Sequence, residues 1–489
     1  MVGLLAGPLL TMVDSSVVNV AVPDIARSLH TDLATVQWTV SGYLLALAAM
    51  LAASAWLTRR FGSRKVYVVC LAGFTTASAL CALAPNVQSL IAARALQGFA
   101  GAPLTPIAMS LLMGGRDNPT QGAQSRGAAA GVLLFLAPAL GPTLGGILIG
   151  AFGWPSIFLI NLPFGVLGIL GALSIADRFN LPADRAAGFD PLGLALLAVG
   201  SALALYGAGQ GASHHWTDPA IWPFWASGLI LVGLYVAWAW RRPNAVLNLS
   251  VLRDRSAALT MALATLVSVV SFSALFLVPV VMQSIQGFSA FQAGLAMLPQ
   301  GVVMGLGAGL GEYVTRTGRV RLSVFIGSLV LVATTLAMLL IDLRTPGWET
   351  ALILCGRGLA FGLITQPLLV AMLGGVSRSE SADASTLFNV IQRLGGSFGI
   401  GLLASIFAVR AATRVSGALH GLGMAAGNRG ISFSGSMSAS LASAPAPMRS
   451  AVEGALSSSF HDVVWALVAL SSLGIVLALF VSDDGFSRR

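Results

Sequence analysis

Charged residues are scarce in this chain of 489 residues: they make up 9% of it, whereas hydrophobic residues make up 56%. Soluble domains carry roughly 25% charged residues. The composition therefore excludes an ordinary soluble protein and indicates an integral membrane protein. The net charge of +9 does not indicate nucleic-acid binding, because the basic residues are dispersed between apolar runs, as in the cytoplasmic loops of membrane proteins.

Residues that commonly build reactive sites are also few. The three cysteines lie in apolar stretches without paired spacing, and the five histidines are scattered without a zinc motif. The sequence contains no GxxxxGK[ST] phosphate-binding loop, so we do not expect the chain to use ATP. Its serine-rich segments lack a companion histidine and aspartate in a recognisable arrangement. We therefore expect a protein that is not an enzyme and that needs no metal or cofactor.

Long apolar runs, by contrast, are abundant. A membrane-spanning helix needs about 20 apolar residues. Basic residues number eighteen in the short segments expected in the cytoplasm, against only Arg27 and Arg344 in the short loops expected outside. We predict an all-α integral membrane protein with fourteen spans and both termini in the cytoplasm, the first span directing insertion. The predicted spans are 2–26, 36–57, 66–85, 88–113, 127–150, 154–176, 190–209, 221–240, 257–283, 291–313, 321–341, 350–374, 385–409 and 461–482.

A weak internal repeat suggests how the spans are grouped. AWLTRRFGSRK (55–65) resembles GEYVTRTGRVR (311–321), and GPTLGGILIG (141–150) resembles RLGGSFGIG (393–401), both pairs being eight spans apart. Two related six-helix bundles separated by an inserted pair of spans explain this offset and suit a transporter, although a coincidence of glycine-rich helices is the alternative. The predicted units are an N-terminal bundle (1–178), an inserted pair (179–256), and a C-terminal bundle (257–489) with an external loop at 411–459.

Few ionisable residues lie within the spans. Each costs about 2.5–3.5 kcal/mol at mid-helix and should therefore face protein or water. Asp14 lies in TMVDSSVVNVAVPDIA (11–26), close to the polar side chain of Asn19. Such an acid can take up a proton on one side of the membrane and release it on the other, and the alternative is a permanent ion pair with an arginine of a neighbouring helix. The ionisable residues within spans are chiefly Asp14, Arg94, Glu312, Arg357 and Arg393.

Three further groups of polar residues are candidates. Arg94 lies in RALQG (94–98) one turn before Gln97, and it could tune a nearby acid, pair with substrate charge, or extend to the membrane interface. Glu312 could take part in proton coupling or form a simple surface pair with Arg316, four residues on. Polar residues of the thirteenth span are expected to line a central cavity together with Asn19 and Gln97: they are Asn389, Gln392 and Arg393.

The stretch LLFLAPALGPTLGGILIG (133–150) combines prolines and glycines in one predicted helix. Proline frees backbone carbonyl groups and bends a helix. Glycines spaced at i and i+4 form a small face that allows another helix to approach closely. This segment is expected to form an interface that moves. Its residues of interest are Pro138, Gly141, Pro142, Gly145 and Gly146.

Taken together, these motifs resemble the major facilitator superfamily, specifically its fourteen-span drug:proton antiporter branch. The resemblance implies a proton-driven exporter of lipophilic, often cationic drugs or dyes that works by alternating access. Our hypothesis is that Asp14 binds the proton, and a cationic substrate in competition with it, while Arg94 tunes the acid. The resemblance rests on VDSSVVNVAVPDI (13–25), RALQG (94–98), APALGPTLGG (137–146), WPSIFLINLPFG (154–165) and FDPLGLALLAVG (189–200).

One loop departs from the family pattern, which usually reads G-x-L-x-D-R-x-G-R-[RK]. Ala55 replaces the first glycine, Arg59 replaces the acid, and the second copy has Thr315 at the position of the acid. This puts in doubt any gating pair that the acid normally makes. Some tripartite-pump members of the branch resemble this variant, which leaves open an accessory periplasmic adaptor as a partner. The residues that remain in the gating loop are Arg60, Gly62, Arg64 and Lys65.

The leading hypothesis is thus a proton-coupled antiporter in the inner (plasma) membrane, with protons, a small-molecule substrate and the lipid bilayer as partners. A second hypothesis is a dedicated exporter of one endogenous metabolite, such as an antibiotic, a siderophore or a lipid. A third is a membrane-embedded sensor or scaffold that has lost transport. Substrate profiling separates the first two hypotheses, and gradient-dependent flux separates both from the third.

Overall fold

The computed structural model describes residues 2–113, 141–173, 189–211, 218–242, 245–342, 345–374, 381–421 and 445–481. Within these ranges the chain is helical, with no β-strand. The first group of helices comprises α1 (Val2–Ser28), α2 (Leu33–Val36), α3 (Trp38–Phe61), α4 (Ser63–Ala82), α5 (Val87–Gly101), α6 (Leu104–Met113), a helix at Gly141–Phe152, α8 (Ser156–Leu159) and α9 (Asn161–Leu173). They are followed by α10 (Pro191–Gly211), α11 (Trp222–Trp240), η2 (Leu249–Arg253), α12 (Arg255–Ser284), α13 (Ala290–Arg316), α14 (Val320–Ala337), η3 (Met338–Leu340), α15 (Gly347–Gly374), α16 (Ser381–Gly421) and α18 (Ala446–Ala478).

The helices bear out a multi-pass membrane protein. Eleven helices of the described ranges are long and apolar enough to cross a membrane, and Trp38–Ser54 and Gly141–Phe152 are shorter apolar helices. The predicted span 88–113 is interrupted, because α5 ends at Gly101 and α6 begins at Leu104. Pro103 lies in this break, where it cannot donate a backbone hydrogen bond.

Local sequence signals explain several helix ends. The Asn86 side chain accepts a hydrogen bond from the backbone of Ser89 and caps α5, and Ser289 caps α13 through Gln292 in the same way. Gly62 separates α3 from α4 with a φ of 83°, a conformation that favours glycine. Polar residues at these ends thus satisfy backbone groups that have no partner within the helix.

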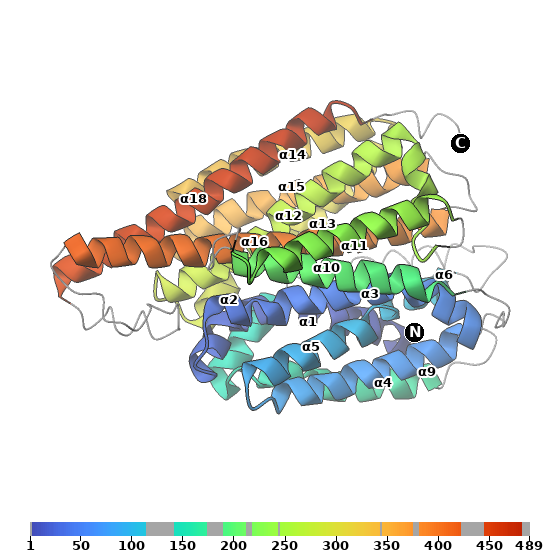
Figure 1. Cartoon of the computed structure of the whole chain (residues 1–489), viewed down its shortest axis with the longest axis horizontal. Coiled ribbons are helices and arrows are strands. Elements are labelled where there is room, and N and C mark those ends of the chain that lie inside the picture. Colours follow the sequence, from blue (N-terminus) through green and yellow to red (C-terminus); the bar gives the residue numbers. More distant parts are fainter. Residues whose placement is uncertain are drawn as a thin grey trace.

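The N-terminal and C-terminal helices gather on different sides of the molecule. Figure 1 shows α1 to α9 below, α12 to α18 above, and α10 and α11 between them. Within the first group, α1 packs on α9, and α5 packs on both α3 and α4; within the second, α12 packs on α16, and α15 packs on both α13 and α14. Helices α10 and α11 pack mainly on each other, while α10 also contacts α3 and α16.

Hydrogen bonds join the two groups at one end of the molecule. Gln37, which precedes α3, and Ser41 of α3 both contact α16. Gln37 Nε2 donates to Ser405 Oγ at 3.2 Å, and Ser397 Oγ donates to the Ser41 carbonyl at 2.7 Å. At the same end, Gln283 Nε2 of α12 donates to the Val20 carbonyl of α1 at 2.8 Å. These contacts lie near the end of α1 and the beginning of α3, on the side away from the Arg59–Lys65 loop.

Helices extend into both ends of the segment 411–459 that we predict to be external. Helix α16 continues to Gly421, and α18 begins at Ala446, fifteen residues before the predicted start of the last span at 461. Arg414 and Asp462 form an ion pair at 2.7 Å between these two helices. Figure 1 shows the paired ends of α16 and α18 extending beyond the other helices. The apolar pattern alone located the membrane part of these helices but not their polar extensions.

Candidate functional site

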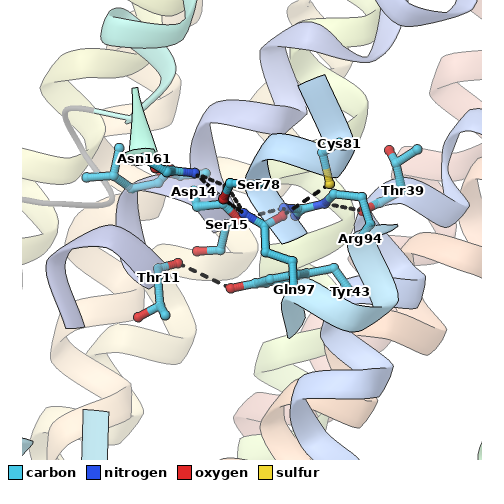
Figure 2. Close-up of polar contacts among 12 residues, drawn as sticks. Thr11, Asp14, Ser15, Thr39, Tyr43, Ser78, Cys81, Arg94, Gln97 and Asn161 are labelled. Atoms are coloured by element: carbon cyan, nitrogen blue, oxygen red, sulfur yellow. Dashed lines mark hydrogen bonds and ion pairs between the residues drawn. The ribbon is translucent and has the colours of Figure 1, made fainter. Parts of the chain in front are cut away.

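Asp14 is fully buried near the middle of α1, where three side chains hydrogen-bond to it. Arg94 Nη1 lies 2.5 Å from Asp14 Oδ2, and the two residues form an ion pair. Gln97 Nε2 and Asn161 Nδ2 each donate to Asp14 Oδ1 at 2.9 Å. Figure 2 shows these side chains converging on the carboxylate from α1, α5 and α9. The cost of burying the acid is offset by one opposite charge and two amide donors.

Ser78 of α4 completes what we term the Asp14 cluster: Asp14, Ser78, Arg94, Gln97 and Asn161. Its Oγ accepts hydrogen bonds from Gln97 Nε2 at 2.6 Å and from Asn161 Nδ2 at 3.2 Å. The two amide groups therefore bridge the carboxylate and the hydroxyl. Four helices contribute to the cluster, so a change in the charge of Asp14 acts on the packing of α1, α4, α5 and α9 together.

Arg94 is held by contacts besides the carboxylate. Its Nε donates to the Thr39 carbonyl at 2.9 Å, and its Nη1 lies 2.5 Å from Gln97 Oε1. The guanidinium carbon lies 4.1 Å from the ring centroid of Tyr43 and 5.6 Å from that of Phe158. Cation–π contacts of this kind stabilise a buried positive charge. Arg94 does not extend to the membrane interface, because its side chain is buried in this set of contacts.

Glycine allows α3 and α5 to approach closely enough to form the cluster. A Cβ atom on Gly98, the last residue of RALQG, would lie 2.4 Å from the Tyr43 backbone oxygen. Only a residue without a side chain fits this contact. The motif therefore supplies the cation, an amide and the close approach that brings Tyr43 against Arg94.

The proline- and glycine-rich segment lies between α1 and α13. A Cβ atom on Gly141 would meet the Ser16 side chain, one on Gly145 would meet Val17, and one on Gly146 would meet the backbone of Ala290. Thr143 Oγ1 donates to the Gly294 carbonyl at 2.9 Å, and the Pro142 carbonyl also lies against Gly294. The segment thus contacts both groups of helices. Pro138 lies outside the described residues.

Other predicted site residues lie apart from the cluster. Asn19 is buried and donates from Nδ2 to the Ser15 carbonyl at 3.4 Å, whereas its Oδ1 has no hydrogen-bond partner among the described residues. Asn389 is exposed and donates to the Ser385 carbonyl of its own helix. Gln392 and Arg393 are half-buried on α16. The structure brings Gln97 to Asp14, but it does not bring these four residues to it.

Glu312 belongs to the molecular surface. Its side chain is 60% exposed and forms an i,i+4 ion pair with Arg316 at 2.6 Å. Exposed ion pairs such as Glu312–Arg316 contribute little to stability, so the geometry of Glu312 fits the surface-pair alternative.

In the gating loop, Arg64 Nη2 donates to the Leu173 carbonyl at 2.5 Å, Arg60 is half-buried, and Lys65 is exposed.

Sequence reasoning missed Asn161, Ser78 and Tyr43. Asn161 lies within WPSIFLINLPFG, where it is the only amide in an apolar run, and that isolation is a signal that could have identified it. Ser78 and Tyr43 carried no such signal, because serine and tyrosine are common in membrane helices. The described residues contain no group of three or more His, Cys, Asp or Glu side chains placed to hold a metal ion.

A second buried arginine lies in the C-terminal helices. Arg357 of α15 is 3% exposed; its Nη1 donates to Thr335 Oγ1 at 2.8 Å and its Nη2 to the Val270 carbonyl at 3.1 Å. Both of these partners are neutral. Arg357 forms no ion pair with a carboxylate of the described residues.

Comparisons with known proteins agree with the membrane architecture. Residues 4–400 match the family described as the Major Facilitator Superfamily. A Multidrug resistance protein B homolog of Mycobacterium tuberculosis is 34% identical over 80% of this chain and 72% of its own length. The putative multidrug resistance protein MdtD of Escherichia coli is 32% identical over 81% of this chain and 83% of its own length. A probable actinorhodin transporter of Streptomyces coelicolor is 32% identical over 83% of this chain and 71% of its own length.

Solved structures share the fold. The bacterial homolog of the human lysosomal transporter Spinster, in an inward-facing and unoccupied conformation, superposes with a TM-score of 0.65 at 15% identity. The alignment covers 98% of this chain and 97% of that one.

Proposed function

The chain belongs to the Major Facilitator Superfamily, and we propose that it is a proton-coupled antiporter that exports lipophilic drugs or other toxic compounds across the cytoplasmic membrane. It is a transporter and not an enzyme. Relatives named for multidrug resistance support the export of drugs. The observation that carries the proton-coupling part of the proposal is the Asp14 cluster, in which one buried acid is shared by four helices.

Asp14 can couple protonation to helix packing through its ion pair. When the carboxylate takes up a proton, it loses its charge and Arg94 loses its counter-ion. The charged and neutral forms of Asp14 therefore favour different arrangements of α1 and α5, as coupling between protonation and conformation requires. In this proposal Arg94 and Gln97 hold the acid, and Asn161 joins them as a further positioning residue.

Alternating access would then be a movement between two six-helix bundles, 1–178 and 257–489, with an inserted pair of helices in 179–256. With both termini in the cytoplasm, the contacts Gln37–Ser405, Ser41–Ser397 and Val20–Gln283 lie at the outer end of the bundles. In this proposal the contacts close the outer end of the bundles in the present conformation. Protonation from the outside would have to break these contacts during each cycle.

The segment 141–152 is proposed as part of the moving interface. Thr143 and Gly146 contact Gly294 and Ala290 of α13 across the two bundles, whereas Gly141 and Gly145 lie against α1. The segment therefore touches both the helix that carries Asp14 and the opposite bundle. Movement of α1 upon protonation can reach the bundle interface through these close contacts.

A dedicated exporter of one endogenous metabolite is the second candidate. Relatives named as a probable actinorhodin transporter and as a methylenomycin A resistance protein of Bacillus subtilis favour a narrow antibiotic substrate. A single strongly transported compound would support this function over broad drug export. A periplasmic adaptor as a partner stays a proposal that follows from the altered gating loop alone.

The test of proton coupling uses purified protein in liposomes with an imposed pH gradient and a panel of lipophilic dyes. Asp14→Asn keeps the size and polarity of the side chain but removes the titrating group, so we expect gradient-driven flux to fall to the background of empty liposomes. The matched control is Glu312→Gln, which neutralises an exposed acid and should transport like the wild type. Normal gradient-driven flux by Asp14→Asn would overturn the proposal.

A further inference from the structure

Positive charge exceeds negative charge deep in the membrane spans. We consider positions that lie at least six residues from either end of a predicted span. At these positions the chain carries one acid, Asp14, and three arginines, Arg94, Arg357 and Arg393. Asp14 neutralises Arg94. The other two arginines belong to the C-terminal helices, where the excess is therefore two positive charges.

Arg393 lies on the face of α16 that meets the N-terminal helices. Ser397, one turn further along the same face, donates to the Ser41 carbonyl of α3 at 2.7 Å. The Arg393 guanidinium is also near enough to Tyr43 of α3 for the two side chains to interact electrostatically. Arg393 is half-buried and makes neither a hydrogen bond nor an ion pair with any described residue.

A guanidinium at this depth requires acceptors for its donors. It presents five N–H groups, and leaving such a group without partners in an apolar region is expensive. Because the described part of the protein supplies no acceptor to Arg393, its N–H groups are available to water or to a bound molecule. Its position between the two groups of helices is where an alternating-access transporter holds its cargo.

Asp14, the acid that could bind a cation, already has hydrogen-bond donors on both carboxylate oxygens. Asp14 Oδ2 accepts from Arg94, and Asp14 Oδ1 accepts from both Gln97 and Asn161. Arg357 adds a second fixed positive charge to the C-terminal helices, because its partners Thr335 and Val270 are neutral. The electrostatic potential between the helix groups therefore favours an anion over a cation.

We propose that the transported molecule is a lipophilic anion whose acidic group, such as a carboxylate, sulfonate or phenolate, binds the Arg393 guanidinium. The inference rests on the export function proposed above and specifies the substrate class. It replaces the cationic cargo that the family resemblance implied. An anion at Arg393 would attract a proton to Asp14 instead of displacing it, so proton and cargo occupy separate groups and the exchange between them is conformational.

The binding test uses two dyes that share a xanthene core and differ in charge. Sulforhodamine B carries sulfonates that stay ionised at neutral pH, whereas rhodamine 6G is a cation. Binding to the purified full-length protein is followed by fluorescence anisotropy. We expect the wild type to bind sulforhodamine B, Arg393→Gln to bind it about tenfold or more weakly, and Arg393→Lys to recover most of the affinity.

The matched control is Arg316→Gln, which removes an exposed positive charge from α13 and should leave the affinity for sulforhodamine B unchanged. Undiminished binding of sulforhodamine B by Arg393→Gln, or binding of rhodamine 6G alone by the wild type, would overturn the inference. Arg393→Lys distinguishes a specific loss of binding from a global loss of structure. If the positive charge of lysine restores the affinity that Arg393→Gln loses, misfolding does not explain the loss.

A transport assay separates failure of this inference from failure of the proposed function. If liposomes with the wild type move rhodamine 6G against a pH gradient but do not bind sulforhodamine B, export stands and the anion site is wrong. If sulforhodamine B binds through Arg393 but no gradient moves either dye, the anion site stands and proton-coupled export is wrong.

Discussion

Two buried arginines occupy similar places in the two groups of helices, and their partners differ most in charge. Arg94 of α5 begins RALQGFAG (94–101), and Arg357 of α15 begins RGLAFG (357–362). Arg94 contacts α1 through Asp14, and α4 supplies Ser78 to the same network; Arg357 contacts α12 through the Val270 carbonyl and α14 through Thr335. Each arginine thus joins corresponding helices of its group, but among the described residues a carboxylate pairs with Arg94 and none pairs with Arg357.

This difference separates two uses of a buried charge. On the N-terminal side, the proposed protonation of Asp14 would remove the negative charge of the pair and leave Arg94 without its counter-ion. On the C-terminal side, the partners of Arg357 among the described residues are neutral, so they leave its positive charge in place. Under the proposed coupling, the same scaffold would hold a switch where an acid faces the arginine and a fixed charge where none of the described acids does.

The largest expected difference between the two sites comes from removing each arginine. Arg94→Met leaves Asp14 buried without its cation, and breaking a buried pair in this way costs about 3–5 kcal/mol. Arg357→Met leaves no orphaned acid and removes a desolvated charge, so its free energy of unfolding should change by about 1 kcal/mol or less. The measurement is unfolding by SDS titration in mixed micelles, with Arg316→Met as the exposed control. Equal costs at both sites would refute the distinction between them.

A smaller effect is expected from filling the close contacts that follow each arginine. A Cβ atom on Gly98 would lie 2.4 Å from the Tyr43 carbonyl, and one on Gly362 would lie 2.3 Å from the Met304 carbonyl. Both Gly→Ala substitutions should cost about 1–3 kcal/mol by overpacking. Only Gly98→Ala should also weaken proton-driven flux, because it displaces Tyr43 from Arg94. Gly309→Ala, which meets open space, is the control, and flux that falls equally in both variants would remove the functional contrast.

A contrast in the opposite direction is expected at the hydroxyl groups beside the two arginines, where the loss should be larger on the C-terminal side. Thr335→Val removes one of only two hydrogen-bond acceptors of Arg357 in the described structure and should cost about 1–3 kcal/mol. Ser78→Ala should cost about 0.5–1.5 kcal/mol, because Gln97 and Asn161 keep Asp14 as an acceptor. The same SDS titration measures both. A larger loss for Ser78→Ala would mean that Ser78 contributes more to the Asp14 cluster than its contacts indicate.

The sequence predicted the parts of the site that are unusual for a membrane helix. Asp14 and Arg94 are costly at this depth, and that cost alone marked them as candidates. Gln97 followed from its spacing in the same motif. Glu312 was a candidate because it lies at the end of a span, but only coordinates distinguish an exposed i,i+4 pair from a coupled one.

Contacts between segments that are distant in the chain could not be predicted from the sequence. Asn161 reaches Asp14 across 147 residues, and Arg357 binds a backbone carbonyl that every residue possesses. Helix position was predicted well where apolar runs are long, and less well where a proline interrupts a run, as at Pro103, or where polar residues prolong a helix, as in α16. An apolar pattern indicates where a helix contacts lipid or a protein core. A proline break and a polar extension of a helix do not depend on such contact, so the pattern does not predict them.

The fixed positive charges of Arg357 and Arg393 also have a consequence for the energy source of transport. If one proton on Asp14 is exchanged for one singly charged anion, two positive charge equivalents move inward in each cycle. A membrane potential of 100 mV contributes about 2.3 kcal/mol for each charge that crosses it. The voltage would then drive both halves of the exchange, and export could continue when the pH difference across the membrane has vanished.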